Sequence, residues 1–399
     1  MNAHNDPNGR LMDIIINHLS GLSPFSIQLR SYITVVIIAG IDYATGPYLS
    51  MLIFYLLPIV ITTWFIGRRA GFYISVVSAI ACFAHDILFF FTDSVQPLTS
   101  WLLLIWNPVI ALSVFVIVVL TLSAMRRAED EKLRCEFKVA AEVQGRLLPQ
   151  SFPSMKTLVY RAYCKPTTII SGDYYDFLLI APGKLGIAIG DIAGKGISAA
   201  LLMANLQGLL RSYAPIRCDD LAELMADINN SLFTSTDSSK FATLFYGVYD
   251  DTNRSLTYVN AGHNPPIVFR KQNGNRFAGN GDTEGKPGAM NYFLNNTSYD
   301  IVRMEAGGTV VGAFPNAIYK PQTLQLNTGD VLVLFTDGLS DARNFIHEQY
   351  GEERLASFVA ANLHHPYTKL HELILDDVNQ FTGDGIQFDD MTLVVAKVV

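Results

Sequence analysis

The segment GDIAGKGIS, residues 190–198, places Asp191 and Lys195 among glycines, between an apolar run and a predicted helix. Glycine-rich turns in that position often bind phosphate. The P-loop pattern, however, needs four residues between its first glycine and the Gly-Lys pair, and then a Ser or Thr directly after the lysine. Here three residues follow Gly190 before that pair, and Gly196 follows the lysine. The spacing therefore excludes a P-loop and leaves the role of Asp191 to be explained.

Three further aspartates stand beside predicted strands in the same way. Asp173 lies in SGDYYDF, Asp337 follows VLVLFT, and Asp389 begins DDMTLVVAKV. An aspartate at the end of a strand lies at the rim of a sheet, where several strands can direct oxygen atoms to one point. Oxygen ligands in octahedral geometry suit Mg²⁺ and Mn²⁺. One such residue is usually a turn or cap residue, but the group of four favours a site for two metal ions.

The elements that would position these carboxylates follow from the apolar runs after residue 158. Short turns between the strands favour antiparallel sheets covered by helices, an α+β two-sheet sandwich rather than a doubly wound sheet. The predicted strands are residues 185–189, 242–248, 255–259, 266–269, 331–335 and 391–398, and the predicted helices are residues 198–211, 218–234, 353–362 and 368–381.

The first third of the chain has a different composition. Hydrophobic residues make up 50% of the 399 residues and charged residues 16%, and the apolar excess lies within residues 31–122. A spanning helix needs about 20 mostly apolar residues. The sequence predicts a cytoplasmic tail over residues 1–26 and an all-α, four-helix transmembrane domain over residues 27–124, with spans at residues 27–44, 49–66, 72–91 and 101–122.

The arginines that flank these spans indicate the orientation. With four crossings, Arg30, Arg68, Arg69, Arg126 and Arg127 all lie on one side, which the positive-inside rule makes cytoplasmic. No cleavable signal peptide is predicted, because no small-residue cleavage site follows a short early apolar run. We therefore expect a multi-pass protein of the inner (cytoplasmic) membrane whose C-terminal domain is cytoplasmic.

A charged connector over residues 125–150 joins the membrane domain to the predicted catalytic domain, residues 151–399. It carries a stripe with a 3.5-residue period, which favours a parallel homodimer through this helix, with packing onto the chain's own domain as the alternative. The stripe consists of Leu133, Phe137, Ala140, Gln144 and Leu147.

Charge and cysteine content exclude two classes of protein. The net charge is -7 and no basic patch is present, so we expect no nucleic-acid partner. The four cysteines contain no CxxC pair, so neither a disulfide framework nor a zinc site is predicted.

Seven motifs occur in an order and at a spacing that resemble a known family. They cover residues 140–399 and read AAEVQGRLLP, SGDYYDF, GDIAGKGISAALLMA, FATLFYGVYD, YVNAGHNPP, LVLFTDGLSDARN and DDMTLVVAKV. The sequence resembles the SpoIIE/RsbU-type serine phosphatases, the bacterial branch of the protein phosphatase 2C-like, metal-dependent (PPM) group. This resemblance implies two stacked antiparallel sheets flanked by helices, with a pair of Mn²⁺ or Mg²⁺ ions at one edge.

The resemblance also assigns roles to single residues. Asp191 resembles the carboxylate that bridges both ions, beside the backbone carbonyl of Ile192. Asp173 resembles a ligand of one ion, and Asp337 and Asp389 resemble ligands of the other. Four other residues are expected near these ligands in supporting roles: Asp390 and Asp176 as structural residues, His263 in a structural turn rather than as a general acid, and Lys195 facing the substrate.

The implied chemistry is hydrolysis of a phosphate ester. Two cations bridged by a water lower its pKa and neutralise the phosphoryl oxygens, so no nucleophilic Ser or Cys is needed. The resemblance implies a membrane-bound protein serine/threonine phosphatase acting on an anti-sigma-factor antagonist in a partner-switching pathway. Two alternatives stay open: a two-metal nucleotide cyclase and a catalytically silent receptor.

The sequence departs from the family pattern at two places. Residues 271–307 are longer than the usual connection and rich in Gly and Asn, which predicts a surface loop. Lys165, in KPTTIISGD, replaces a small residue, and we expect it to be solvated rather than to bind phosphate.

Overall fold

The computed structural model describes residues 18–19, 21–45, 51–90, 98–236, 240–271, 289–294, 297–305, 307–383, 385 and 387–399. The chain forms two compact units, Met1–Glu136 and Phe137–Val399. Most of the predicted N-terminal tail lies outside the described residues.

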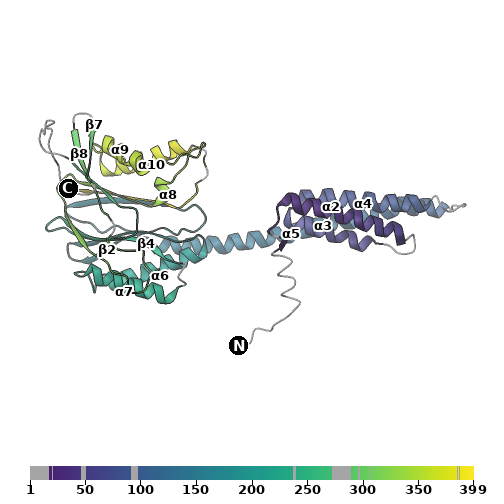
Figure 1. The fold of residues 1–399 in the computed structure, drawn as a ribbon, viewed down its shortest axis with the longest axis horizontal. Helices are drawn as coiled ribbons and strands as arrows, with labels where there is room; N and C mark the ends of the chain where they lie inside the picture. The colour runs from purple at the N-terminus through teal and green to yellow at the C-terminus, as the bar shows by residue number, and fades with distance from the viewer. Residues whose placement is uncertain are drawn as a thin grey trace. The chain divides into compact units, whose positions relative to one another are not determined.

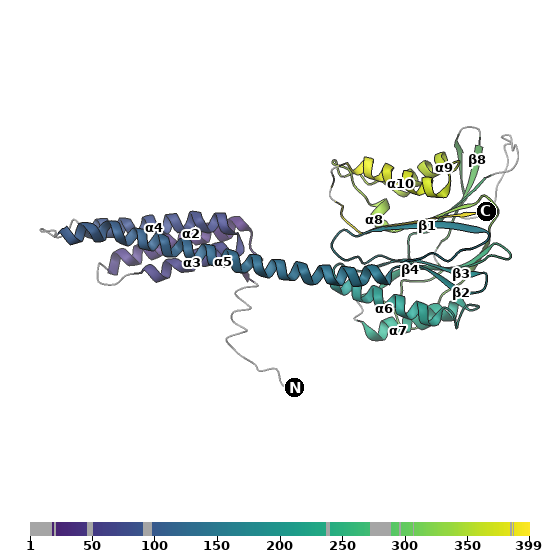
Figure 2. The same ribbon diagram turned by 180° about the vertical axis from the view of Figure 1, so that it is seen from behind.

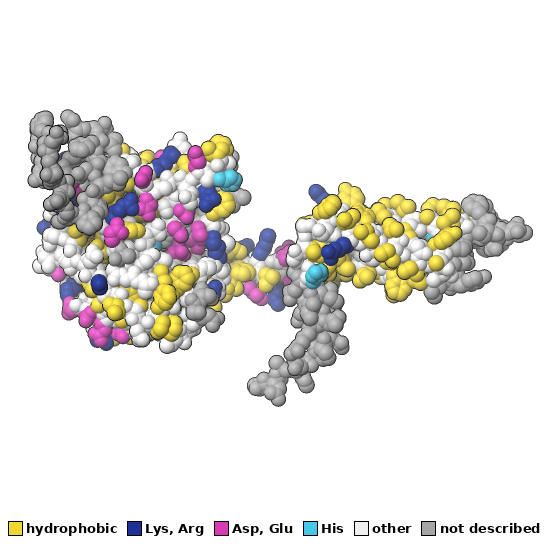
Figure 3. All heavy atoms as spheres, viewed as in Figure 1, with side chains coloured by type: hydrophobic (Ala, Val, Ile, Leu, Met, Phe, Trp, Pro, Cys, Tyr) yellow, Lys and Arg dark blue, Asp and Glu magenta, His cyan; other side chains and the backbone are white. Residues whose placement is uncertain are grey.

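The first unit is entirely helical where it is described. Its elements are α2 (Pro24–Thr45), the 3-10 turn η1 (Leu52–Tyr55), α3 (Leu56–Phe65), α4 (Arg68–Phe90) and the first part of α5 (Leu98–Leu147) (Figure 1). Their shared core includes Val35, Ile59, Ile74 and Phe115. Hydrophobic side chains also cover much of the outer surface of this unit, as Figure 3 shows. An apolar outer surface is what a helix bundle in lipid requires.

The prediction of four spanning helices is wrong. Three helices among the described residues are long and apolar enough to cross a membrane, at Pro24–Thr45, Arg68–Leu88 and Leu104–Leu147. The segment predicted at residues 49–66 forms only η1 and the ten-residue α3. Gly67, with a φ of 129°, turns the chain directly into α4. Apolar composition located this segment, but it did not reveal how short the helix is.

The second unit is a sandwich of two antiparallel sheets, which confirms the predicted α+β fold. The strand order of one sheet is β1 (Leu158–Lys165), β11 (Met391–Val398), β10 (Val331–Phe335), β6 (Ile267–Lys271), β8 (Thr297–Arg303) and β7 (Ala289–Leu294). The order of the other is β2 (Tyr174–Ala181), β3 (Lys184–Ile192), β4 (Ala242–Asp250), β5 (Ser255–Ala261) and β9 (Gln322–Gln325).

Helices cover both outer faces of the sandwich, as Figures 1 and 2 show. The helices α6 (Ile197–Tyr213) and α7 (Leu221–Ser235) pack on the five-stranded sheet, and α9 (Glu352–Asn362) and α10 (Tyr367–Thr382) pack on the six-stranded sheet. A third core between the sheets includes Phe245, Leu332 and Val394. Strands covered on both faces read as continuous apolar runs, which is why β3, β10 and β11 were visible in the sequence.

The prediction of a loop over residues 271–307 is wrong in part. Residues 272–288 lie outside the described residues, but β7 and β8 follow and pair antiparallel with each other. β8 also pairs with β6 and buries Ile301. The Asn-rich composition concealed these strands, because their pairing partners rather than their own apolar content make them strands.

Candidate metal centre

The four predicted aspartates occupy the ends of neighbouring strands. Asp191 is the penultimate residue of β3, and Asp173 directly precedes β2. Asp337 begins the four-residue helix α8 (Asp337–Ser340) just after β10, and Asp389 lies just before β11. The Asp191 carboxylate interacts electrostatically with Asp337, Asp389 and Asp173. The fold therefore gathers all four into one acidic cluster.

Burial and mutual repulsion raise the pKa values of these carboxylates. Burial, with Asp337 and Asp389 nearby, raises the pKa of Asp191 to about 7. Burial also holds the pKa of Asp173 well above its usual range, and burial together with Asp389 raises the pKa of Asp337. Each shift reflects the cost of holding a carboxylate charge in a buried position beside other carboxylates. A divalent cation would remove that cost.

The donor set of the cluster fits Mg²⁺ or Mn²⁺. Within the described residues, no three His, Cys, Asp or Glu side chains already surround one point closely enough to hold an ion. These ions, however, keep several water ligands and take only some of their oxygens from the protein. The backbone carbonyl of Ile192 also lies close to the loop that carries Asp173. A Cβ atom added at Gly172, the residue before Asp173, would lie 3.4 Å from its oxygen. Side chains, carbonyl and water together can complete such a site.

Two threonines fix the orientation of Asp173. Its Oδ2 accepts hydrogen bonds from Thr336 Oγ1 (2.7 Å) and Thr392 Oγ1 (2.6 Å). The backbone N–H of Thr392 in turn donates to Thr336 Oγ1 (2.9 Å). The ends of β10 and β11 thus hold a carboxylate that belongs to the other sheet.

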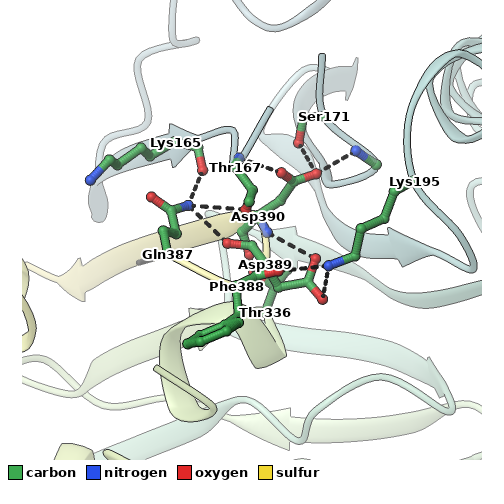
Figure 4. Close-up of polar contacts among 10 residues, drawn as sticks. Lys165, Thr167, Ser171, Lys195, Thr336, Gln387, Phe388, Asp389 and Asp390 are labelled. Carbon is green, nitrogen blue, oxygen red and sulfur yellow. Dashed lines mark hydrogen bonds and ion pairs between the residues drawn. The ribbon is translucent and has the colours of Figure 1, made fainter. Parts of the chain in front are cut away.

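Asp390 organises the loop before β2. One carboxylate oxygen accepts from the backbone N–H of Thr167 (2.6 Å), and the other accepts from Ser171 Oγ (2.9 Å) and Gly172 N–H (2.6 Å). Figure 4 shows these bonds converging on Asp390. Both oxygens thus make contacts that shape the loop, which supports a structural role for this residue.

Lys195 is an exposed residue whose ammonium lies beside Asp389. Its Nζ is 3.0 Å from Asp389 Oδ2 and donates to the carbonyl oxygen of Phe388 (2.7 Å), as drawn in Figure 4. The ammonium therefore faces the acidic cluster, and its charge offsets part of the rise that burial and Asp389 cause in the pKa of Asp337. The lysine of the opening motif is thus placed at the edge of the cluster.

Position 338 must be a glycine because the backbone of the segment before β11 passes very close to it. A Cβ atom at this position would lie 1.8 Å from the carbonyl oxygen of Asp390 and 3.2 Å from the carbonyl carbon of Asp389. The start of α8 and the segment before β11 can approach this closely only because residue 338 lacks a side chain. This contact brings the segment that carries Asp337 close to the segment that carries Asp389.

His263 and Asp176 are both buried, and Thr243, which bonds His263, also accepts a hydrogen bond from the backbone N–H of Asp191 (3.3 Å). His263 is 4% exposed, burial lowers its pKa to about 4, and its Nδ1 bonds Thr243 Oγ1 (3.0 Å). Asp176 is 1% exposed and pairs with Arg211, whose Nε lies 2.7 Å from Oδ2. The structural roles expected for His263 and Asp176 stay predictions, and the burial of both side chains supports them.

A groove of about 450 Å³ opens beside Asp389. Its charged lining residues are Lys165, Lys195, Asp341, Arg343 and Asp389. Lys165 is exposed, as expected; its backbone carbonyl accepts a hydrogen bond from Gln387 Nε2 (3.0 Å), and the residue lines this groove.

Sequence reasoning missed the residues that hold the cluster. Thr336, Thr392, Thr243 and Ser171 carry no recognisable metal-ligand pattern. A weak signal existed, because Thr336 and Ser171 are small polar residues one or two positions before a predicted ligand. Gln144 was assigned to the connector stripe, whereas it is 8% exposed and bonds Ser171.

The sandwich and its edge of carboxylates define the class of protein. The chain resembles the solved SiaA-PP2C domain of Pseudomonas aeruginosa with a TM-score of 0.54 and 17% identity, over 68% of this chain and 98% of that domain. At this identity the likeness establishes the fold, which is that of the protein phosphatase 2C-like domains.

The family follows from the sequence itself. The family model described as Stage II sporulation protein E (SpoIIE) matches residues 181–284 and 291–399. The chain belongs to this family.

Two curated relatives place the chain within the family. It is 28% identical over 278 residues to the phosphoserine phosphatase RsbU of Bacillus subtilis, covering 68% of this chain and 72% of RsbU. It is 27% identical over 295 residues to Protein IcfG of Synechocystis, covering 67% of this chain but only 42% of IcfG. The chain thus spans less than half of one of these relatives and most of the other, and it is a homologue of phosphoserine phosphatases.

Proposed function

We propose that this protein is a membrane-anchored, metal-dependent phosphoserine/phosphothreonine protein phosphatase. The observation that carries the proposal is the convergence of Asp173, Asp191, Asp337 and Asp389 at one edge of a SpoIIE-family sandwich, with their pKa values raised by burial and mutual proximity. A site that gathers carboxylates at this cost is suited to divalent cations.

In this proposal the four aspartates hold two ions, Mn²⁺ or Mg²⁺. Asp191, with the carbonyl of Ile192 beside it, would contribute to both ion sites, Asp173 would contribute to one, and Asp337 and Asp389 would contribute to the other. Bound ions supply Lewis acidity for the hydrolysis of a phosphate monoester. The remaining residues position these ligands: Thr336 and Thr392 orient Asp173, and Asp390 shapes the loop that carries it.

The reaction is attack of water on phosphorus, cleavage of the bond between phosphorus and the seryl oxygen, and protonation of that oxygen to give serine and inorganic phosphate. Lys195 lies where it can contact the phosphoryl oxygens, next to the groove that begins at Asp389. Lys165 and Arg343 line the same groove and can contact acidic groups of a protein segment that carries the phosphate.

The substrate that we propose is a phosphorylated anti-sigma-factor antagonist, so that the output would be partner switching. The proposal is supported by similarity to RsbU, a relative of which the chain spans 72%. Regulation through the membrane unit would then connect an external signal to transcription.

The test is an assay of the full-length chain in detergent micelles with and without Mn²⁺. We expect release of inorganic phosphate from phosphorylated regulatory proteins that depends on the metal. Formation of a cyclic nucleotide from a nucleoside triphosphate, without phosphoprotein hydrolysis, would favour the cyclase. Metal-independent binding of a partner with neither activity would favour the silent receptor.

We also propose that the N-terminus and the catalytic domain lie on the cytoplasmic side of the inner membrane. Gln28 in the first turn of α2 lines the same pocket as Gly67, Arg68 and Arg69, and the Arg126 guanidinium donates to the carbonyl oxygen of Trp64. The start of α2 and the point where α5 leaves the first unit therefore share one end of that unit, because the short η1–α3 segment, although not of spanning length, returns the chain to this end before α4 begins. The same end carries its arginines, which the positive-inside rule makes cytoplasmic.

The prediction is that reporter fusions at residue 5 and at residue 399 both report the cytoplasm. A fusion inserted between α2 and η1, after residue 47, should report the opposite side and serves as the control. If the fusions at residues 5 and 399 report opposite sides of the membrane, the chain does not return to the side on which its N-terminus lies.

A homodimer along α5 is a further part of the proposal. Leu133, Val139 and Val143 are 48%, 59% and 57% exposed on a helix that is otherwise highly charged in this region, so a second copy could cover them. Light scattering of the chain in micelles should give the mass of two copies. We expect Val139→Glu to convert it to one copy, whereas a wild-type monomer would remove the dimer from the proposal.

A further inference from the structure

The last turns of α5 are hydrogen-bonded to the loop that carries Asp173. Gln144 Nε2 donates to the carbonyl oxygen of Ser171 (2.7 Å), and Gln144 Oε1 accepts from the backbone N–H of Ser171 (2.9 Å). Both side chains are buried, at 8% and 3% exposure, and both residues belong to the unit Phe137–Val399. One amide side chain thus satisfies both backbone groups of a single loop residue.

Ser171 connects this amide to the metal centre by two further bonds. Its Oγ donates to Asp390 Oδ2 (2.9 Å) and accepts from the backbone N–H of Asp173 (3.0 Å). Asp390 adjoins the candidate ligand Asp389, and its N–H donates to Asp389 Oδ1 (3.0 Å). A displacement of Ser171 would therefore move candidate ligands from both sheets.

The end of α5 is held independently by α6. The carbonyl oxygen of Leu147 accepts from Gln207 Nε2 (2.7 Å) and from Arg211 Nη2 (3.1 Å). Arg211 is itself held by the buried carboxylate of Asp176. Because Leu147 is anchored in this way, the fold does not depend on Gln144 alone to keep α5 in place, and the Gln144 contact is available for a second role.

We propose that Gln144 is a positioning residue of the metal centre, which holds Ser171, and through it Asp173 and Asp390, at the spacing that two divalent cations require. The inference rests on the proposed function of that centre. A glutamine is suited to this role because its amide donates and accepts at once, which neither Glu nor Leu can do. The connector helix thereby contributes a side chain to the geometry of the site.

The experiment measures Mn²⁺ binding to the full-length chain in micelles by isothermal titration calorimetry, alongside the Tm of the metal-free protein. Substituting a residue that orients metal ligands typically weakens metal binding by about 10- to 100-fold, so we expect Gln144→Ala to raise the Kd for Mn²⁺ at least about 10-fold. Hydrolysis lost by this variant at limiting Mn²⁺ should recover at saturating Mn²⁺.

Gln150→Ala is the matched control. Gln150 follows the end of α5, and its amide donates to the carbonyl oxygens of Gly145 (2.7 Å) and Leu148 (2.9 Å). We expect this variant to keep the wild-type Kd. Gln144→Glu retains the acceptor for the Ser171 N–H but loses the donor, and it should also raise the Kd.

Ser171→Ala tests the path from Gln144 to the ligands. It removes the hydroxyl but not the backbone groups that Gln144 binds, so it should raise the Kd for Mn²⁺ as well. If both residues act through one path, the double variant should be little weaker than the worse single variant.

Three results would decide against the inference. An unchanged Kd in Gln144→Ala, or independent additive effects of the two substitutions, would overturn the role of Gln144 while leaving the phosphatase assignment in place. A wild-type chain that binds no Mn²⁺ would overturn the proposed function, and this inference with it.

Discussion

Asp191→Asn is expected to abolish metal-dependent phosphate release while leaving the chain folded. The substitution removes the one carboxylate that interacts with Asp173, Asp337 and Asp389 together, and hence the proposed ligand of both ions. Metal ions contribute several kcal/mol of transition-state stabilisation, so we expect a loss of at least about 1,000-fold, equivalent to about 4 kcal/mol. The measurement is the rate of phosphate release across a series of Mn²⁺ concentrations.

The same substitution should stabilise the metal-free protein. Burial raises the pKa of Asp191 to about 7, so above that pH its charge is present at a cost to the folded state. A neutral amide removes this repulsion, and the Tm measured at pH 8 in a chelator should rise, whereas the increase in Tm on adding Mn²⁺ should disappear.

Asp219→Asn is the control for this substitution. Asp219 forms an exposed ion pair with Lys184, and such pairs contribute little to stability, so its activity and its response to Mn²⁺ should be those of the wild type. A variant at Asp191 that keeps the wild-type rate at limiting Mn²⁺ would remove this residue from the metal centre.

Sequence alone predicted the sandwich and the positions of the four aspartates, because both depend on local patterns. An apolar run ending in Asp is visible within ten residues, and β3 and β10 were found in that way. The contacts that orient the ligands are of another kind. Thr336 and Thr392 reach Asp173 across 163 and 219 residues of sequence, and only the pairing of the strands brings them together.

The errors have the same origin. The short helix α3 is as apolar as a spanning helix, and its length is set by the turn at Gly67 rather than by composition. The strand β8 lies in an Asn-rich stretch, where pairing with β6 makes it a strand. The apolar stripe of the connector favoured a dimer, with packing onto the chain's own domain as the alternative. At Gln144 the structure favours packing onto the chain's own domain, because this side chain bonds Ser171.

Gly338→Ala is expected to impair activity more than it impairs folding. The added methyl group would lie 1.8 Å from the carbonyl oxygen of Asp390, and backbone rather than a flexible side chain would have to move. Overpacking of this kind costs about 1–3 kcal/mol, so the catalytic domain should still fold, with a Tm lowered by several degrees. Asp337 and Asp389 would be pushed apart, and a misplacement of about 1 Å in a catalytic group can cost 100-fold in rate.

The matched control for this prediction is Gly208→Ala in α6, where an added Cβ meets nothing within 4 Å. Replacing a helical glycine with alanine stabilises a helix by roughly 0.5–1 kcal/mol, so this variant should keep its activity and gain slightly in Tm. Calorimetric titration with Mn²⁺ then distinguishes the cause in Gly338→Ala. If the close approach of α8 to the segment before β11 sets the ligand spacing, Mn²⁺ affinity falls together with the rate. Wild-type affinity and rate, in a protein that is merely less stable, would show that Asp337 and Asp389 do not need this contact to bind the same ion.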